Sequence, residues 1–236
     1  MIQTAFIAHL REVINEKHLL KHPFYQLWSK GTLPIEAMQR YAEQYYHLEK
    51  NFPRFLSAIH TNCEDVNFRQ EITDNLYDEE HGPNNHRELW TWFGEAIGVK
   101  REAVQNTEAL PETRKTVETL MRLASRSPIA GSAAMAAYES QTPAVSKSKI
   151  EGLEKHYGIT DERGLAFFKV HSVLDVEHAD SWWKMIEKEA TTPEVQKQVE
   201  DALVEARDAL WGFLDGICKA YVPEALTTCN KELLPS

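Results

Sequence analysis

The sequence predicts an all-α protein that folds as a single-domain helical bundle. Apolar residues recur at intervals of three and four positions, from the segment Ile2–Leu20 to the segment that begins at Pro193. No stretch alternates apolar and polar residues for long enough to predict a strand. No linker or internal repeat divides the 236 residues. We therefore expect roughly eight or nine helices in one domain over residues 1–222, followed by a C-terminal tail over residues 223–236.

Proline and glycine delimit the helices predicted in the first half of the chain. Proline is tolerated in the first turn of a helix, and glycine often follows the last turn. The predicted segments are residues 2–20, Pro23 to Gly31, Pro34 to Phe52, Pro53 through Ile59, Asp65 to Glu80, and His86 to Gly98. The sequence Gly82-Pro83 should break the chain between the last two of these helices.

The second half begins with a polar link and then continues in helices. The run Gly131–Glu139 is small and apolar, so we expect its helix to be buried on all sides. Pro143 should kink that helix, which then continues to Gly158. The remaining predictions are a polar link over residues 99–111, a helix through Val117 and Leu123, one long helix over Arg163–Glu189, and a last helix over Pro193–Tyr221.

Composition excludes several classes of protein. The formal charge of -10 and the absence of a Lys/Arg cluster argue against nucleic acid as a partner. Cys63, Cys218 and Cys229 are widely spaced, which excludes a disulfide framework and a cysteine-type zinc site. The N-terminus has no signal-peptide pattern, and no segment approaches 18 consecutive apolar residues. We expect a reduced, cytoplasmic protein with no membrane partner.

Three metal-type side chains occur together in the long helix predicted over Arg163–Glu189. His171, Asp175 and His178 stand at i, i+4 and i+7. At 100° per residue, Asp175 lies about 40° and His178 about 20° from His171 around a helix, and all three point into its apolar stripe. Burial of a carboxylate and two imidazoles without partners is costly, so a metal ion or a buried His-Asp hydrogen bond should compensate them.

Three further ionisable residues share apolar surroundings. Glu79 extends the apolar face of Ile72, His86 follows it by seven residues, and Glu139 ends the small apolar run. With His171, Asp175 and His178 they make three carboxylates and three imidazoles. Such a set suits two divalent first-row ions, because three negative charges against four positive charges leave one charge for a hydroxo or oxo bridge. Oxygen and nitrogen ligands favour iron or manganese over zinc.

A ferritin-like ligand frame is disfavoured. That frame uses Glu-x-x-His on two helices, and this chain contains only Asp78-x-x-His81 and Asp175-x-x-His178. We interpret Asp78 and His81 as the solvated end of a helix beside Gly82.

Four segments of the chain resemble a known family. They are the aromatic run Phe24–Gly31, Asp78-Glu79-Glu80 with His86, Tyr138-Glu139-Ser140-Gln141, and His171-x-x-x-Asp175-x-x-His178. Together they are similar to the chlamydial protein associating with death domains (CADD) and its bacterial relatives. These belong to the haem-oxygenase-like dimetal oxidases, which are related to pyrroloquinoline quinone synthesis protein C and to TenA-type proteins. The resemblance covers about residues 5 to 220, although the sequence of the loop 80–85 differs somewhat from that of the chlamydial protein.

The resemblance implies a haem-oxygenase-like fold and an O2-dependent oxidase that makes para-aminobenzoate for folate synthesis. In that family a tyrosine of the protein itself supplies the aromatic ring and a lysine is the amino donor. By position these residues are Tyr25 and Lys149, and Tyr41 matches a second tyrosine near the metals. The implied cofactors are two transition-metal ions, Fe/Fe or Mn/Fe, with O2 and an external reductant. Apart from the resemblance, Tyr25 reads as a core aromatic and Lys149 as a solvated helix lysine.

Two rival functions stay open at this point. The chain can be a related dimetal oxidase or oxygenase that acts on an external small molecule, or an interaction module that binds death domains. A thiaminase-type hydrolase is disfavoured, since no cysteine adjoins a ligand motif. As partners we expect O2, a reductant and a second copy of the chain in a homodimer.

Overall fold

The computed structural model describes residues 5–226, except for the side chains of Val176 and Glu177. Every regular element in this range is helical, which confirms the all-α prediction, and thirteen α-helices exceed the expected number. Their bounds are α1 Ala5–Glu16, α2 Pro23–Lys30, α3 Ile35–Glu49, α4 Phe52–Asn62, α5 Val66–Glu80, α6 His86–Ala96, α7 Arg101–Asn106, α8 Pro111–Arg126, α9 Pro128–Glu139, α10 Thr142–Gly152, α11 Glu162–His171, α12 Leu174–Glu189 and α13 Pro193–Tyr221; the short helical turns η1 and η2 cover Leu19–Lys21 and Leu153–Tyr157.

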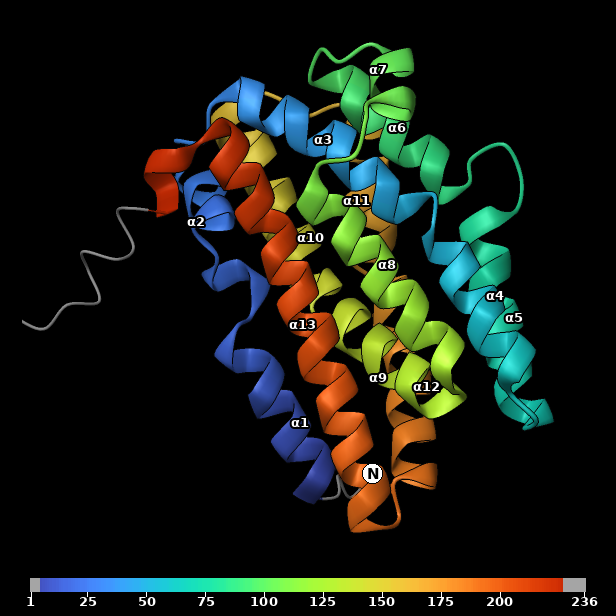
Figure 1. Cartoon of the computed structure of the whole chain (residues 1–236). Coiled ribbons are helices and arrows are strands. Elements are labelled where there is room, and N and C mark those ends of the chain that lie inside the picture. The colour runs from blue at the N-terminus through green and yellow to red at the C-terminus, as the bar shows by residue number, and fades with distance from the viewer. Residues whose placement is uncertain (1–4, 227–236) are drawn as a thin grey trace, which may run out of the picture.

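The long helix α13 forms one side of the bundle and packs on α8 and α9, with α1 alongside it (Figure 1). Its start follows the predicted signal, because the Thr192 side chain accepts a hydrogen bond from the Val195 N–H and Pro193 occupies the first turn. A second group of helices, α3, α6, α10 and α11, packs together at the end of the bundle where α3 and α6 lie in Figure 1.

Helix α9 is the buried centre of the bundle, as its composition predicts. All residues from Ala130 to Glu139 are buried, and α4, α8, α12 and α13 pack around them. Small side chains allow this close approach. A Cβ added to Gly131 lies 2.4 Å from Cγ1 of Ile59 on α4, so no larger residue fits there without movement.

The prediction of one continuous helix over Arg163–Glu189 is wrong, and the difference affects the candidate site. The chain forms two helices, α11 and α12, which are separated at Ser172 and Val173. Neither residue is a glycine or proline, so no local signal announces the break. Val173, with φ of -117° and ψ of -57°, is also two-thirds exposed, which marks a bend at the surface.

Two other predicted boundaries differ from the structure. The polar link over residues 99–111 contains the helix α7, and Pro143 starts the separate helix α10 rather than a kink. Pro143 has this effect because a proline in the first turn leaves no N–H unsatisfied. Residues 223–226 are helical, and the rest of the predicted tail lies outside the described residues.

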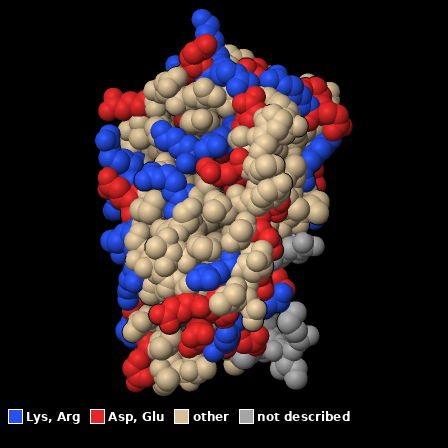
Figure 2. All heavy atoms as spheres, turned by 90° about the vertical axis from the view of Figure 1, so that its right-hand side faces the viewer, with Lys and Arg blue, Asp and Glu red and all other residues tan. Residues whose placement is uncertain are grey.

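Acidic and basic side chains are interspersed on the face that carries α4 and α5 (Figure 2). This face therefore shows no continuous basic surface of the kind that binds a phosphate backbone. Cys63 and Cys218 are buried free thiols. Among the described helices, none combines the length and the apolar character that a membrane span requires.

Candidate metal centre

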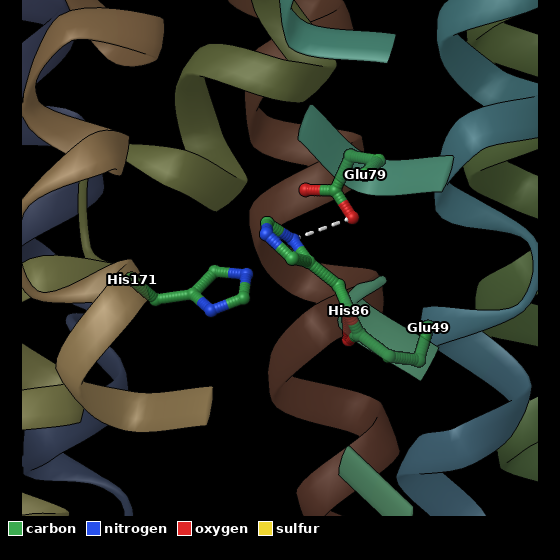
Figure 3. Close-up of side chains that lie close together, drawn as sticks. All are labelled: Glu49, Glu79, His86 and His171. Carbon is green, nitrogen blue, oxygen red and sulfur yellow. Dashed lines mark ion pairs between the residues drawn. The ribbon is translucent and has the colours of Figure 1, made fainter. Parts of the chain in front are cut away.

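Four buried ligand-type side chains from four helices converge in the bundle and form a first cluster. Glu49 ends α3, Glu79 lies in the last turn of α5, His86 begins α6 and His171 ends α11. One ligand atom from each lies within 4.8 Å of the others. Figure 3 shows His171 pointing across the interior from α11 towards His86 and Glu79. We call these four residues the first cluster.

The loop between α5 and α6 returns the chain so that Glu79 and His86 meet. Gly82 has a positive φ of 79°, which glycine adopts without strain, and the turn begins there. Asn85 then caps α6 by accepting a hydrogen bond from the Glu88 N–H. Nδ1 of His86 lies 2.8 Å from Oε2 of Glu79 as a result. The expected proximity of these two residues across the Gly82-Pro83 break is thus found.

A second cluster lies beside the first and consists of Glu139, Asp175 and His178. Glu139 is the last residue of α9, and the other two stand in the first two turns of α12. Nδ1 of His178 is 3.7 Å from Oε1 of Glu139 and 3.8 Å from Oδ1 of Asp175. These distances exceed a hydrogen bond, so the three side chains surround a point without closing on one another.

The break between α11 and α12 divides the predicted triplet between the two clusters. His171 belongs to the first cluster, whereas Asp175 and His178 belong to the second. The expectation of one continuous helical stripe is therefore wrong, although the six predicted side chains all lie in the two clusters. The break separates the ligands of one helical motif so that they can serve two positions.

Neighbouring side chains hold the second cluster in place. Both oxygens of Glu139 accept hydrogen bonds, one from the Asn75 amide at 3.1 Å and one from the Trp182 indole. Nε2 of His178 lies 3.3 Å from Oδ2 of Asp78. Asp78, interpreted from the sequence as part of a solvated helix end, is thus partly exposed but contacts the cluster. A carboxylate on the outer nitrogen of an imidazole fixes its ring orientation and tautomer, as around many metal sites.

Several buried polar atoms of the clusters have no hydrogen-bond partner in the described part of the chain. They include Oε2 of Glu79, Nδ1 of His86 and Nδ1 of His178. The close approach of Glu79 to His86 lacks the geometry of a hydrogen bond. Buried polar atoms are rarely left unpaired, and unpaired carboxylate oxygens and imidazole nitrogens that converge are the donors that divalent cations use. The residues present therefore fit two metal ions.

The mutual electrostatics of these groups in the metal-free protein give the same indication. Burial raises the pKa of Glu139 to about 8, with Asp175 adding to the effect. Burial and the neighbouring His86 lower the pKa of His171 to about 3, which keeps its imidazole neutral. For His178 burial opposes protonation, but Asp175 and Glu139 raise its pKa to about 9. Perturbations of this size are typical of functional sites rather than of a packed core.

Glu49 is a candidate ligand that the sequence analysis missed. Burial raises its pKa well above the usual value, and the Glu79 and Asp175 carboxylates raise it further. A signal was present, because Tyr41, Tyr45 and Glu49 stand at i, i+4 and i+8 and so share one face of α3. The position of Glu49 at the end of a helix beside polar residues resembles a solvated terminus, and no metal-ligand spacing links it to another ligand.

Tyr25, Tyr41 and Lys149 lie together in the interior, close to the two clusters. Nζ of Lys149 donates a hydrogen bond of 2.7 Å to Oη of Tyr41, and that oxygen is 3.0 Å from Oη of Tyr25. All three side chains are buried, so the interpretation of Lys149 as a solvated lysine is wrong. Burial lowers the pKa of Lys149 to about 7, while the Glu49 carboxylate acts in the opposite direction. The amine is therefore partly neutral at pH 7.

Helices α2 and α10 are held together around this group by Trp28. Its indole N–H donates a hydrogen bond to the Lys149 carbonyl, and Gly152 leaves space for the ring, since a Cβ there lies 2.6 Å from Cδ1 of Trp28. The pKa values of Tyr25 and Tyr41 are raised above the usual range, chiefly by burial. Both phenols therefore remain protonated at neutral pH.

Two small cavities adjoin one another in this region. The carboxylate cavity has a volume of about 10 Å³ and the lysine cavity about 20 Å³. Tyr45, Tyr138 and Thr142 line both cavities, and Oη of Tyr138 donates a hydrogen bond of 2.7 Å to Oη of Tyr45. The tyrosine pair thus forms the wall between the two clusters on one side and Lys149 with Tyr25 on the other.

Comparison with known proteins agrees with this architecture. Residues 39–211 match the family model of iron-containing redox enzymes with the haem-oxygenase-like fold. The chain is 42% identical over 231 residues to the 4-aminobenzoate synthase of Nitrosomonas europaea, covering 94% of each chain. It is 39% identical over 227 residues to the 4-aminobenzoate synthase of Chlamydia muridarum, covering 96% of this chain and 94% of the relative.

A solved structure shows the same fold at low sequence identity. A TenA homologue from Pseudomonas syringae superimposes with a TM-score of 0.81 at 17% identity, covering 91% of this chain and 93% of that one. The predicted haem-oxygenase-like fold is confirmed by this likeness and by the family match. The buried clusters of carboxylates and imidazoles supply the ligands that an iron-containing redox enzyme requires. The chain belongs to the family of iron-containing redox enzymes with the haem-oxygenase-like fold and is an oxidoreductase.

Proposed function

We propose that this protein is an O2-dependent dimetal oxidase that makes 4-aminobenzoate from the side chain of its own Tyr25, with Lys149 as the amino donor. The observation that carries the proposal is the buried chain of hydrogen bonds from Lys149 through Tyr41 to Tyr25. The names of the relatives at 42% and 39% identity support the product class.

The first cluster would hold one metal ion and the second cluster the other. Glu49, Glu79, His86 and His171 offer two carboxylates and two imidazoles, while Glu139, Asp175 and His178 offer two carboxylates and one imidazole. Two bound redox-active ions, iron with iron or manganese with iron, would supply the electrons for the reduction of O2. The asymmetry of the two donor sets allows the sites to prefer different ions.

Tyr25 and Lys149 are suited to the roles of ring donor and amine. Because burial keeps the Tyr25 phenol protonated, its oxidation requires loss of the hydroxyl proton. Oη of Tyr41 at 3.0 Å would accept this proton as the Tyr41 proton passes to the neutral amine of Lys149, 2.7 Å away. Nζ of Lys149 lies 5.3 Å from the centroid of the Tyr25 ring. With a pKa of about 7 this amine carries a free lone pair in a large fraction of molecules at neutral pH.

The size of the interior favours the protein's own tyrosine over an external aromatic substrate. The lysine cavity holds about one water molecule, whereas a free aromatic acid requires several times that space. Tyr25 already places a phenol ring beside the amine. This difference separates the proposal from a related oxidase that acts on an external small molecule.

Mass spectrometry of the protein after turnover tests the proposal. The chain is produced with 15N-labelled lysine and incubated in air with iron, manganese and a reductant. We expect loss of the Tyr25 side chain from its peptide, no more than one 4-aminobenzoate per chain, and the label in the product amine. Tyr25→Phe should abolish product.

Tyr157→Phe is the matched control. Tyr157 is a half-buried tyrosine near Trp28 whose hydroxyl bonds to the Leu33 carbonyl, away from Lys149, so product formation should persist. An intact Tyr25 after many turnovers indicates an external substrate instead. A chain that keeps its partner binding in His171→Ala, forms no 4-aminobenzoate and retains no metal is an interaction module of the death-domain type.

A further inference from the structure

A surface hollow reaches one residue of the second cluster from outside. It lies between α1, α10 and α12 and has a volume of about 550 Å³, which is within the range of sites for small organic molecules. Asp175 lines both this hollow and the interior carboxylate cavity. The Asp175 side chain, which is 2% exposed, therefore lies between the hollow and the candidate metal centre.

The charges around the hollow suit an anion. Arg11 and Lys147 are exposed at its rim, and neither forms an ion pair within residues 5–226. Of the two acidic residues of the lining, Asp180 pairs with Lys184 at 3.1 Å, and Asp175 is only 2% exposed. Arg11 and Lys147 are thus the exposed unpaired charges that an anionic occupant would meet.

A third donor lies in the wall of the hollow. The Trp183 side chain is 5% exposed, and its indole Nε1 has no hydrogen-bond partner in the described residues. The Arg11 guanidinium lies 4.9 Å from the centroid of the Trp183 ring. A buried indole N–H without an acceptor is unusual, because tryptophan normally finds a partner for this group when buried. This N–H is covered in the structure, so a carboxylate or enolate oxygen in the hollow would become its acceptor after a shift of the side chains around it.

The same wall connects the hollow to the second cluster. Trp182 precedes Trp183 in α12 and donates its indole N–H to Glu139. An occupant of the hollow therefore lies beside Asp175 and Trp183, and Trp182 connects the same helix to Glu139 in the interior. Both of these carboxylates belong to the second cluster, so the hollow adjoins the position of one metal ion.

We propose that this hollow is the docking site for an anionic enediolate reductant, held by Arg11, Lys147 and the Trp183 indole. The inference rests on the proposed function, since a dimetal oxidase needs an electron source. Oxidation of the enediolate monoanion to its dicarbonyl releases two electrons and one proton. Two oxidised metal ions held by the clusters would take up one electron each, and the proton would leave to solvent through the open side of the hollow.

Binding of ascorbate to the metal-free full chain tests the site without relying on activity. The probe is the 15N–1H signal of the Trp183 indole, assigned by its loss in Trp183→Phe. We expect a saturable shift, with affinity lowered at least tenfold in the double variant Arg11→Gln and Lys147→Gln. The control Arg126→Gln with Lys155→Gln removes two exposed charges elsewhere and should bind as the unaltered chain does.

Kinetics with loaded metals provide the second arm. The double variant should slow reduction of the oxidised metal ions by ascorbate at least tenfold and leave reduction by neutral hydroquinone unchanged. An unshifted Trp183 signal, or equal affinity in the double variant and the unaltered chain, overturns the proposal. If ascorbate binds and Tyr25 is intact after turnover, the docking site is supported and the self-sacrificing reaction is rejected. If the Tyr25 side chain is lost and ascorbate does not bind, the self-sacrificing reaction is supported and the docking site is rejected.

Discussion

Replacement of Lys149 by methionine should stabilise the metal-free protein at neutral pH. The folded state holds this amine in the interior, where burial lowers its pKa from 10.5 to about 7. Folding therefore carries the cost of removing a proton from the amine or of burying its charge. Methionine has a similar length and no charge, and the Tyr41 hydroxyl keeps Tyr25 as a hydrogen-bond partner.

The magnitude follows from the difference between the two pKa values. At 1.36 kcal/mol per pKa unit the full difference corresponds to about 5 kcal/mol. The lowered pKa in the folded state means that unfolding takes up a proton between pH 7 and pH 10.5, so stability of the lysine protein rises with pH in this window. The advantage of Lys149→Met should thus be about 4 kcal/mol at pH 7, about 2 kcal/mol at pH 9 and below about 0.5 kcal/mol at pH 10.5.

Urea unfolding of the metal-free protein at these pH values measures the effect. Lys147→Met is the matched control, because this lysine is exposed on the same helix and should change the free energy of unfolding by less than about 0.5 kcal/mol. A Lys149→Met protein that is less stable than the unaltered chain at pH 7 would refute the reasoning. So would a stability difference that does not depend on pH.

Three further changes probe the clusters and the core. Glu49→Gln should lower the affinity for one of the two metal ions by about tenfold or more. Metal analysis after dialysis against a weak chelator measures this affinity, and two ions retained with unchanged affinity would exclude Glu49 as a ligand. Trp182→Phe removes the N–H donor to Glu139 and should weaken metal binding by about 10–100-fold. The free energy of unfolding of the metal-free protein should fall by only about 1 kcal/mol. A loss of metal-binding free energy equal to the loss of unfolding free energy would indicate a packing role for Trp182. Gly131→Ala should reduce the free energy of unfolding by about 1–3 kcal/mol because its Cβ meets Ile59, and an unchanged melting temperature would show that α4 yields there.

Local signals in the sequence were sufficient for most of the helices but not for their breaks. Pro23 and Gly31 enclose α2 as expected, and the Thr192-Pro193 pair begins α13. The separation of α11 from α12 at Val173 has no such signal. Its cause is tertiary, because His171 and Asp175 must face different clusters, and periodicity within one segment carries no information about the neighbouring helices.

The candidate site was predictable where several ligands share a spacing or an apolar face. The six side chains from Glu79 to His178 satisfy that condition and lie in the two clusters. Glu49 shares no such spacing or face with another ligand, since it ends a helix whose aromatic residues are interpreted from the sequence as core packing. Asp78 is exposed near the end of α5, as predicted, but its contact with His178, 100 residues away, was not predicted. Long-range contacts of single residues leave no periodic trace in a sequence.

One face of α3 links the chemistry of the two cavities. Tyr41 contacts Lys149, Tyr45 pairs with Tyr138 in the wall, and Glu49 lies in the first cluster, each one helical turn from the next. A helix is stiff over two turns, so the distance between the amine and the first cluster is set by the backbone of α3 rather than by flexible loops. In the proposed reaction, the oxidation would therefore act on Tyr25 across the Tyr45–Tyr138 wall. The proposed internal substrate would need no entry into the lysine cavity before the reaction begins, since Tyr25 already lines that cavity.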